Sequence, residues 1–165
     1  MYYNIYKIFN LESQDMKKIA LSIEINGTKE DVWKIICDIE GSVNNIKGIQ
    51  KIEILEKPEK GFTGLKWRET RTMFGQTATE VMWITNSEEN NFYTTRAESH
   101  GAVYTTRFDL NQKDDVCELT MTFGAELVKF FTKVMTALTG WIFASATKKS
   151  LMEDLTDIKN AVEGN

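Results

Sequence analysis

Two spacings of apolar residues divide this chain into a strand-rich part and a closing helical part. Over residues 48–125, apolar and polar positions alternate, which is the period of half-buried strands. Over residues 127–162, apolar residues recur at steps of three and four without a proline, the period of an amphipathic helix. A shorter strand and helix occupy about residues 19–40. This order predicts an α+β domain in which a curved antiparallel sheet is closed by one long helix.

Turn residues set the limits of the expected elements. The expected strands are residues 19–26, 48–57, 65–73, 77–85, 92–99, 102–110 and 116–125. The short connections among the later strands predict antiparallel neighbours. Thr28 and Asp31 resemble a capping box at the start of the first helix, and Gly41 ends that helix. SVNNI adds a further turn, and Gly140 predicts a bend or break in the closing helix.

Two hairpins allow the strand register to be predicted. With Gly75-Gln76 as a type II′ turn, Arg71 lies opposite Glu80. With His100-Gly101 as the second turn, one face of each strand is mainly apolar and should face the closing helix. On the sheet this inner face gathers Trp67, Met73, Met82, Ile84, Tyr93, Tyr104, Phe108, Leu119, Met121 and Phe123; the helix adds Phe130, Phe131 and Val134. These residues fill a core or line an apolar pocket, since both uses favour Met and aromatic side chains.

Three charged residues, Glu69, Arg71 and Glu80, share this inner face in the expected register. A charge removed from water needs a partner, so Arg71 should pair with the two carboxylates. Three interpretations remain open. The cluster is a structural ion pair, it orients the polar end of a ligand, or one carboxylate acts as a general acid or base.

Other chemically active residues give weaker signals. His100, the only histidine, lies at an expected hairpin tip, where it is a surface residue or a proton-transfer group at a pocket rim. Cys37 and Cys117 sit in apolar patterns and are expected to be buried thiols. We see no catalytic triad, metal-ligand spacing or glycine-rich phosphate loop, and we expect no metal and no cofactor.

Composition narrows the class of protein further. The chain has 165 residues, 42% hydrophobic and 27% charged, which fits one globular domain. A net charge of −4 argues against nucleic acid as the main partner. No apolar run is long enough to span a membrane and no secretory signal is visible, so a cytoplasmic location is expected. Residues 1–15 are expected to be an extension that precedes a single domain over residues 16–165.

Three segments resemble the START-like, or SRPBCC, superfamily. They are IALSIEINGTKEDVWKIICDIE, WRETRTMFGQTATEVMWIT and the closing helix that ends in LMEDLTDIKNAVE. The resemblance covers about residues 17–162 and implies a helix-grip fold, a curved antiparallel sheet wrapped around a C-terminal helix with an apolar cavity between them. It implies binding of lipids, sterols or polyketides, polyketide cyclase or dehydratase activity, or activation of a chaperone. The chain departs from many relatives in having SVNNIKG where they have prolines, so the cavity mouth is expected to differ.

The sequence thus predicts non-covalent binding or transport of a small hydrophobic molecule by a monomer or homodimer. The expected ligand-binding residues are Trp67, Glu69, Arg71, Glu80, Met82, Tyr104, Phe108, Met121, Phe130, Phe131 and Val134. One alternative is a polyketide cyclase/dehydratase-like enzyme. The other is a chaperone-activator-like module that binds a protein through an outer basic surface. That surface comprises Lys66, Arg68, Arg96 and Arg107.

Overall fold

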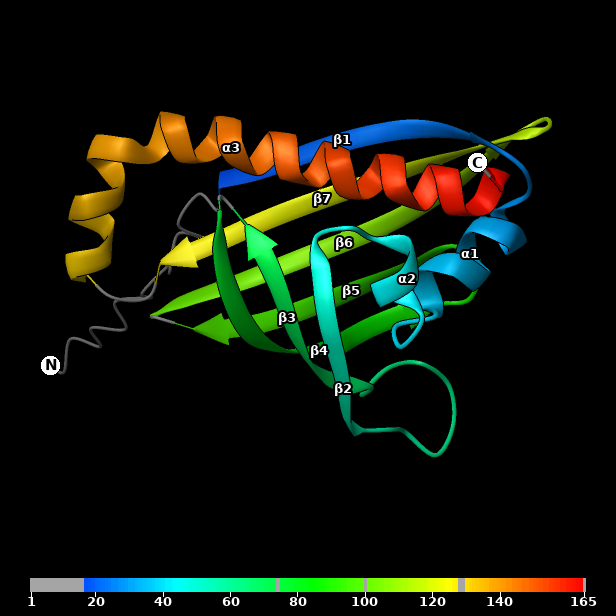
Figure 1. Ribbon diagram of the computed structural model, residues 1–165, viewed down its shortest axis with the longest axis horizontal. Helices are drawn as coiled ribbons and strands as arrows, with labels where there is room; N and C mark the ends of the chain where they lie inside the picture. Colours follow the sequence, from blue (N-terminus) through cyan, green and yellow to red (C-terminus); the bar gives the residue numbers. More distant parts are fainter. Residues whose placement is uncertain (1–16, 74, 100, 128–129, 165) are drawn as a thin grey trace, which may run out of the picture.

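The protein is an open seven-stranded sheet with one long helix across it (Figure 1). The computed structural model describes residues 17–73, 75–99, 101–127 and 130–164, and the side chains of these other than 17, 73, 127 and 130–143. The strands are β1 (Lys17–Asn26), β2 (Ile49–Glu56), β3 (Lys66–Met73), β4 (Gln76–Glu88), β5 (Phe92–Ser99), β6 (Ala102–Lys113) and β7 (Val116–Leu127). The helices are α1 (Lys29–Cys37), α2 (Ser42–Asn45) and α3 (Phe130–Glu163).

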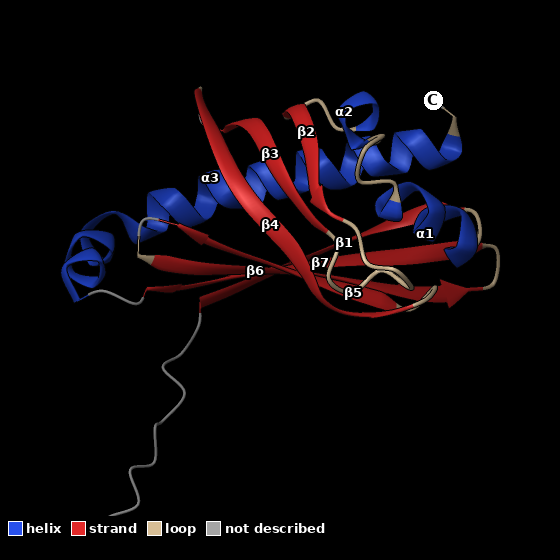
Figure 2. Cartoon of the chain, turned by 90° about the horizontal axis from the view of Figure 1, so that it is seen from below, coloured by secondary structure: helices blue, strands red, loops and turns tan. Residues whose placement is uncertain are grey.

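The sheet has the strand order β1-β7-β6-β5-β4-β3-β2, and every adjacent pair is antiparallel. The helices α1 and α2 carry the chain from one edge strand, β1, to the other edge strand, β2. Figure 2 shows the sheet curling, so that β2, β3 and β4 rise on the side where α3 lies. The curvature and the long helix together confirm the expected helix-grip architecture. The two short helices between the first two strands complete it.

The register of the β3–β4 hairpin differs from the sequence prediction. The strands are joined by residues 74 and 75, so Arg71 lies opposite Ala78 and Glu69 lies opposite Glu80. The predicted turn at Gly75-Gln76 was therefore wrong by one residue, and the predicted pairs by two. A shift of two leaves every side chain on its predicted face, so the apolar pattern cannot distinguish the two registers. Gly75, with φ of 75°, occupies the second connecting position, where glycine accepts the left-handed conformation.

The β5–β6 hairpin has the register that the sequence predicts. Tyr93 lies opposite Phe108, and Thr95 lies opposite Thr106. Its glycine, Gly101, also takes a positive φ at the second connecting position, with φ of 77°. The two hairpins therefore use glycine in the same way, which the sequence prediction recognised in only one of them.

The first helix begins as its sequence indicates. The Thr28 hydroxyl accepts a hydrogen bond from the Asp31 backbone N–H, and the Asp31 carboxylate accepts one from the Thr28 backbone N–H at 3.1 Å. This reciprocal pair is the predicted capping box, and it satisfies donors that a helix start leaves free. The Ile35 and Ile36 side chains of α1 line the space between sheet and α3.

The long helix α3 packs against β1, β7 and α1. In Figure 1 the golden first part of α3 turns away from the axis of the orange and red remainder, so the helix is bent. The later part of α3 supplies Leu151, Leu155 and Ile158 to the core, all at most 8% exposed. No helix in the described part of the chain is long and apolar enough to cross a membrane.

Candidate functional site

A cavity of about 410 Å³ lies between the sheet and the helices. This volume falls within the roughly 300–1,000 Å³ typical of small-molecule sites. Its lining includes Ile35, Ile36, Ile39, Trp67, Ala78, Met82, Tyr93, Ala97, Phe108, Met121, Phe123, Leu151 and Ile158 among the apolar and aromatic residues. Gln76, Thr77 and Ala78, at the start of β4, also belong to the lining and are exposed to solvent. A small apolar molecule therefore has a space between the sheet and the helices.

The inner face predicted from the sequence is the face that lines this cavity. Eight of the predicted site residues are on its wall: Trp67, Glu69, Arg71, Glu80, Met82, Tyr104, Phe108 and Met121. The side chains of the other three, Phe130, Phe131 and Val134, lie outside the described residues, as does His100. The predicted side-chain facing is thus confirmed for the described strands, while ligand binding by these residues stays a prediction.

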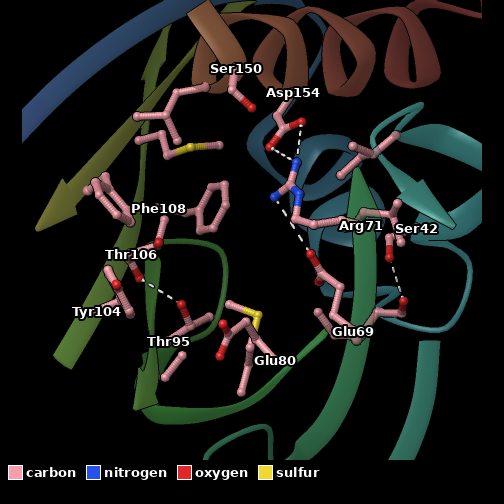
Figure 3. Close-up of a pocket in the computed structure, with 18 of the residues that line it drawn as sticks. Ser42, Glu69, Arg71, Glu80, Thr95, Tyr104, Thr106, Phe108, Ser150 and Asp154 are labelled. Atoms are coloured by element: carbon pink, nitrogen blue, oxygen red, sulfur yellow. Dashed lines mark hydrogen bonds and ion pairs between the residues drawn. The ribbon is translucent and has the colours of Figure 1, made fainter. Parts of the chain in front are cut away.

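Arg71 is the centre of the polar wall, as Figure 3 shows. Its Nη2 donates to both carboxylate oxygens of Asp154 on α3, at 2.9 and 2.7 Å. Its Nη1 lies 3.6 Å from Glu69 Oε1, and Trp67 Nε1 donates to Glu69 Oε2 at 3.3 Å. Arg71 therefore pairs mainly with a helix carboxylate, and not with Glu80 as the predicted register required. The ion pair joins the sheet to the closing helix.

Burial governs the titration of both carboxyl groups beside Arg71. Burial raises the pKa of the Glu69 carboxyl, and the nearby Arg71 charge offsets this only in part. Burial also raises the pKa of Asp154, against the opposing effect of Arg71. One guanidinium thus serves two buried carboxylates, and neither is stabilised as fully as a carboxylate with its own cation.

Glu80 faces Glu69 directly across the β3–β4 pair. Opposed residues of an antiparallel pair have Cβ atoms about 4.5–5.5 Å apart, and like charges there are destabilising. Glu80 is half-buried, and its carboxylate accepts a hydrogen bond from Ser99 Oγ at 2.9 Å. Burial raises the pKa of the neighbouring Tyr104 hydroxyl, and the Glu80 charge raises it further. The wall near Glu80 therefore favours positive charge.

Two buried polar atoms at the cavity have no hydrogen-bond partner among the described residues. They are Arg71 Nε and Thr147 Oγ1. Thr147 is only 2% exposed and lies on α3, seven residues before Asp154. An unsatisfied buried polar group costs about 1–3 kcal/mol, so native structures contain few of them. Both groups belong to residues that line the cavity, where a ligand atom could meet them.

The site predicted from the sequence included no polar residue of α3 and no residue of α2. Thr147, Ser150 and Asp154 line the cavity from α3, and Ser42 and Asn45 line it from α2. Asp154 had a detectable signal, because it lies three residues after Leu151 and four before Ile158, within the apolar stripe of the helix. An acid at such a position indicates a buried charge that needs a partner.

The outer face of the sheet does not offer unpaired positive charge at the four predicted residues. Lys66 pairs with Glu56, and Arg68 with Glu53, each at 2.8 Å. Arg96 and Arg107 likewise pair with Glu98 and Asp109, each at 2.7 Å. This weakens the chaperone-activator alternative, which relied on a basic surface. Among the described residues, no group of three or more His, Cys, Asp or Glu is placed to hold a metal ion.

Solved structures share this fold. A START superfamily protein from Mycobacterium smegmatis superposes with a TM-score of 0.75 at 16% identity, over 89% of this chain and 97% of that one. An aromatase/cyclase from a Streptomyces species gives 0.76 at 12% identity, over 90% and 94%. A protein from Thermus thermophilus gives 0.75 at 13% identity, over 89% and 97%. No family model and no curated protein matches the sequence. The fold is therefore START-like, as the resemblance implied.

Proposed function

We propose that this protein binds a small, largely apolar molecule non-covalently in the cavity between the sheet and α3. The supporting observation is the combination of about 410 Å³ of internal space with a mostly apolar wall. The charged groups among the described lining residues lie on β3, β4 and α3, so they orient one end of a bound molecule. This arrangement is typical of binding sites that take affinity from apolar contact and specificity from a few polar groups.

Native mass spectrometry of freshly purified protein tests the proposal. We expect an adduct of small-molecule mass that disappears on denaturation. The matched variant is Ala97→Phe, because Ala97 lines the cavity and is 4% exposed, so a larger side chain fills the space. Ala20→Phe on the exposed part of β1 is the control.

Loss of the adduct in Ala97→Phe, with native circular dichroism and with binding retained in Ala20→Phe, supports the cavity as the site. An adduct that survives in a folded Ala97→Phe variant contradicts it. Thr95→Leu is the second cavity-filling variant should Ala97→Phe not fold, because Thr95 also lines the wall and is 4% exposed.

A second candidate function is a polyketide cyclase/dehydratase-like reaction. One observation favours it: Glu69 and Glu80 face each other beside an apolar space, where a carboxyl can move a proton to or from a bound chain. Burial raises the pKa of Glu69, which makes a protonated acid accessible closer to neutral pH. Turnover of a poly-β-ketone chain, lost in Glu80→Gln with affinity retained, supports this alternative. Binding without turnover contradicts it.

A further inference from the structure

We propose that the cavity selects a ligand with a basic nitrogen, an apolar molecule whose ammonium group lies at Glu69 and Glu80. This inference rests on the proposed binding function and adds the chemical class of the ligand. Its starting point is the charge of the wall. Among the described lining residues, Arg71 is the one cation, and it stands against three acids, Glu69, Glu80 and Asp154.

The distribution of hydrogen bonds leaves the negative charge on the strand side. The Asp154 carboxylate accepts hydrogen bonds from Nη2 of Arg71 at 2.9 and 2.7 Å, so the net charge of this pair is close to zero. Glu69 has the longer 3.6 Å approach of Nη1 and the uncharged Trp67 N–H at 3.3 Å, and Glu80 has the Ser99 hydroxyl, which carries no charge. The excess negative charge therefore lies at the facing pair Glu69 and Glu80.

An ammonium group would relieve this like-charge contact, because it supplies a counter-charge that the described residues do not provide there. A ligand carboxylate would add a third negative charge to the same wall, and would find Nη2 of Arg71 already held by Asp154. The aromatic lining also favours a cation, since ring faces attract positive charge. Tyr93, Tyr104 and Phe108 supply such rings from β5 and β6.

The unpartnered hydroxyl of Thr147 is independent evidence that a polar ligand belongs in the cavity. It is 2% exposed, it lines the cavity from α3, and no described group bonds to its Oγ1. Arg71 Nε is a second unused group, and it is a donor. A ligand that also carries an uncharged oxygen can accept from Arg71 or bond to Thr147 while its nitrogen meets the carboxylates.

Three probes with one apolar body test the charge preference: decylamine, decanol and decanoate. Isothermal titration calorimetry at pH 7.5 should show decylamine binding at least tenfold more tightly than decanol, and decanoate most weakly. Glu80→Gln and Glu69→Gln should each lower decylamine affinity about tenfold, the size expected for a lost bond to a charged group. Both variants should change decanol affinity far less, so the amine-to-alcohol affinity ratio should fall. Glu98→Gln, on the outer face, is the matched control.

The outcomes separate the two proposals. Equal or tighter binding of decanoate, or an unchanged amine-to-alcohol ratio in both glutamine variants, overturns the charge inference while the binding function stands. Failure of all three probes, together with no native adduct, overturns the binding function and this inference with it. Decylamine binding that persists in folded Ala97→Phe shows adsorption on the acidic surface, and also overturns the inference.

Discussion

The inner and outer faces of the sheet carry similar charged residues in different surroundings. On the outer face, Arg68 meets Glu53 at 2.8 Å with both side chains more than 40% exposed. On the inner face, Arg71 meets Asp154 at 2.7 Å with 21% and 11% exposed. Exposed pairs are worth little, whereas an inner charge without its partner is costly. The number of charges on a face therefore matters less than the number of cations within reach of each buried acid.

The largest expected effect is on Arg71. Arg71→Met removes the partner of two buried carboxylates and should lower the free energy of unfolding by about 3–5 kcal/mol. Arg68→Met, the matched outer variant, should change it by no more than about 1 kcal/mol. Urea denaturation measures both. The double variant Arg71→Met/Asp154→Leu should recover part of the loss, and equal losses in the two single variants would contradict the comparison.

The next effect concerns the unpartnered hydroxyl of Thr147. Thr147→Val keeps the shape and removes the buried polar atom, so it should raise the free energy of unfolding of the ligand-free protein by about 1 kcal/mol. Thr156→Val is the control, because the Thr156 hydroxyl is exposed and donates to the Met152 carbonyl at 2.7 Å. That control should change stability by less than about 0.5 kcal/mol. Thermal unfolding measures both, and a clearly destabilised Thr147→Val would show that the hydroxyl is already bonded.

A pH series compares the effect of buried Glu69 on stability with that of an exposed acid on the outer face. Its folded pKa is raised above the unfolded value, near 4.5, so ionised Glu69 destabilises the folded state. This penalty is present in full above the folded pKa and disappears as the pH falls through the window down to the unfolded value. Glu69→Gln should therefore be more stable than the parent protein at pH 7, by an amount that shrinks toward pH 4.5. Thermal unfolding across this range checks the trend, with Glu53→Gln as the exposed control; a difference that grows on acidification would contradict it.

The smallest expected effect lies in the outer pair itself. A double-mutant cycle on Arg68 and Glu53 should give a coupling of about 0.2–1 kcal/mol. Raising the salt concentration to about 1 M should reduce the coupling, because added ions screen exposed charges. Denaturation of the four proteins at low and high salt measures it. A coupling of several kcal/mol that resists salt would remove the distinction between the two faces.

Much of the fold was predictable from local sequence. Alternation placed Trp67 and Met82 on the inner face, and the cavity wall confirms that facing. Thr28 and Asp31 predicted the start of α1, and the β5–β6 register followed from the position of Gly101. The pairing of β1 with β7 joins strands that are far apart in sequence, and no turn residue indicates such a partner.

Only the strand residues of the candidate site were predictable, because contacts between distant segments leave no local signal in the sequence. The strand residues of the wall follow from side-chain alternation, which tolerates a register error of two residues. The ionic partners do not tolerate it, so Glu80 was assigned to Arg71 when it lies opposite Glu69. Asp154 reaches Arg71 from 83 residues away, through the packing of α3 on the sheet.

The amino-acid sequence alone thus determined which side chains face inward, because the pleat of a strand and the turn of a helix are local properties. The tertiary structure decided which of those inward charges meet, and that a hollow remains between them. Those outcomes depend on how closely the curved sheet and the closing helix approach one another. That separation is set by the packing of all the elements together.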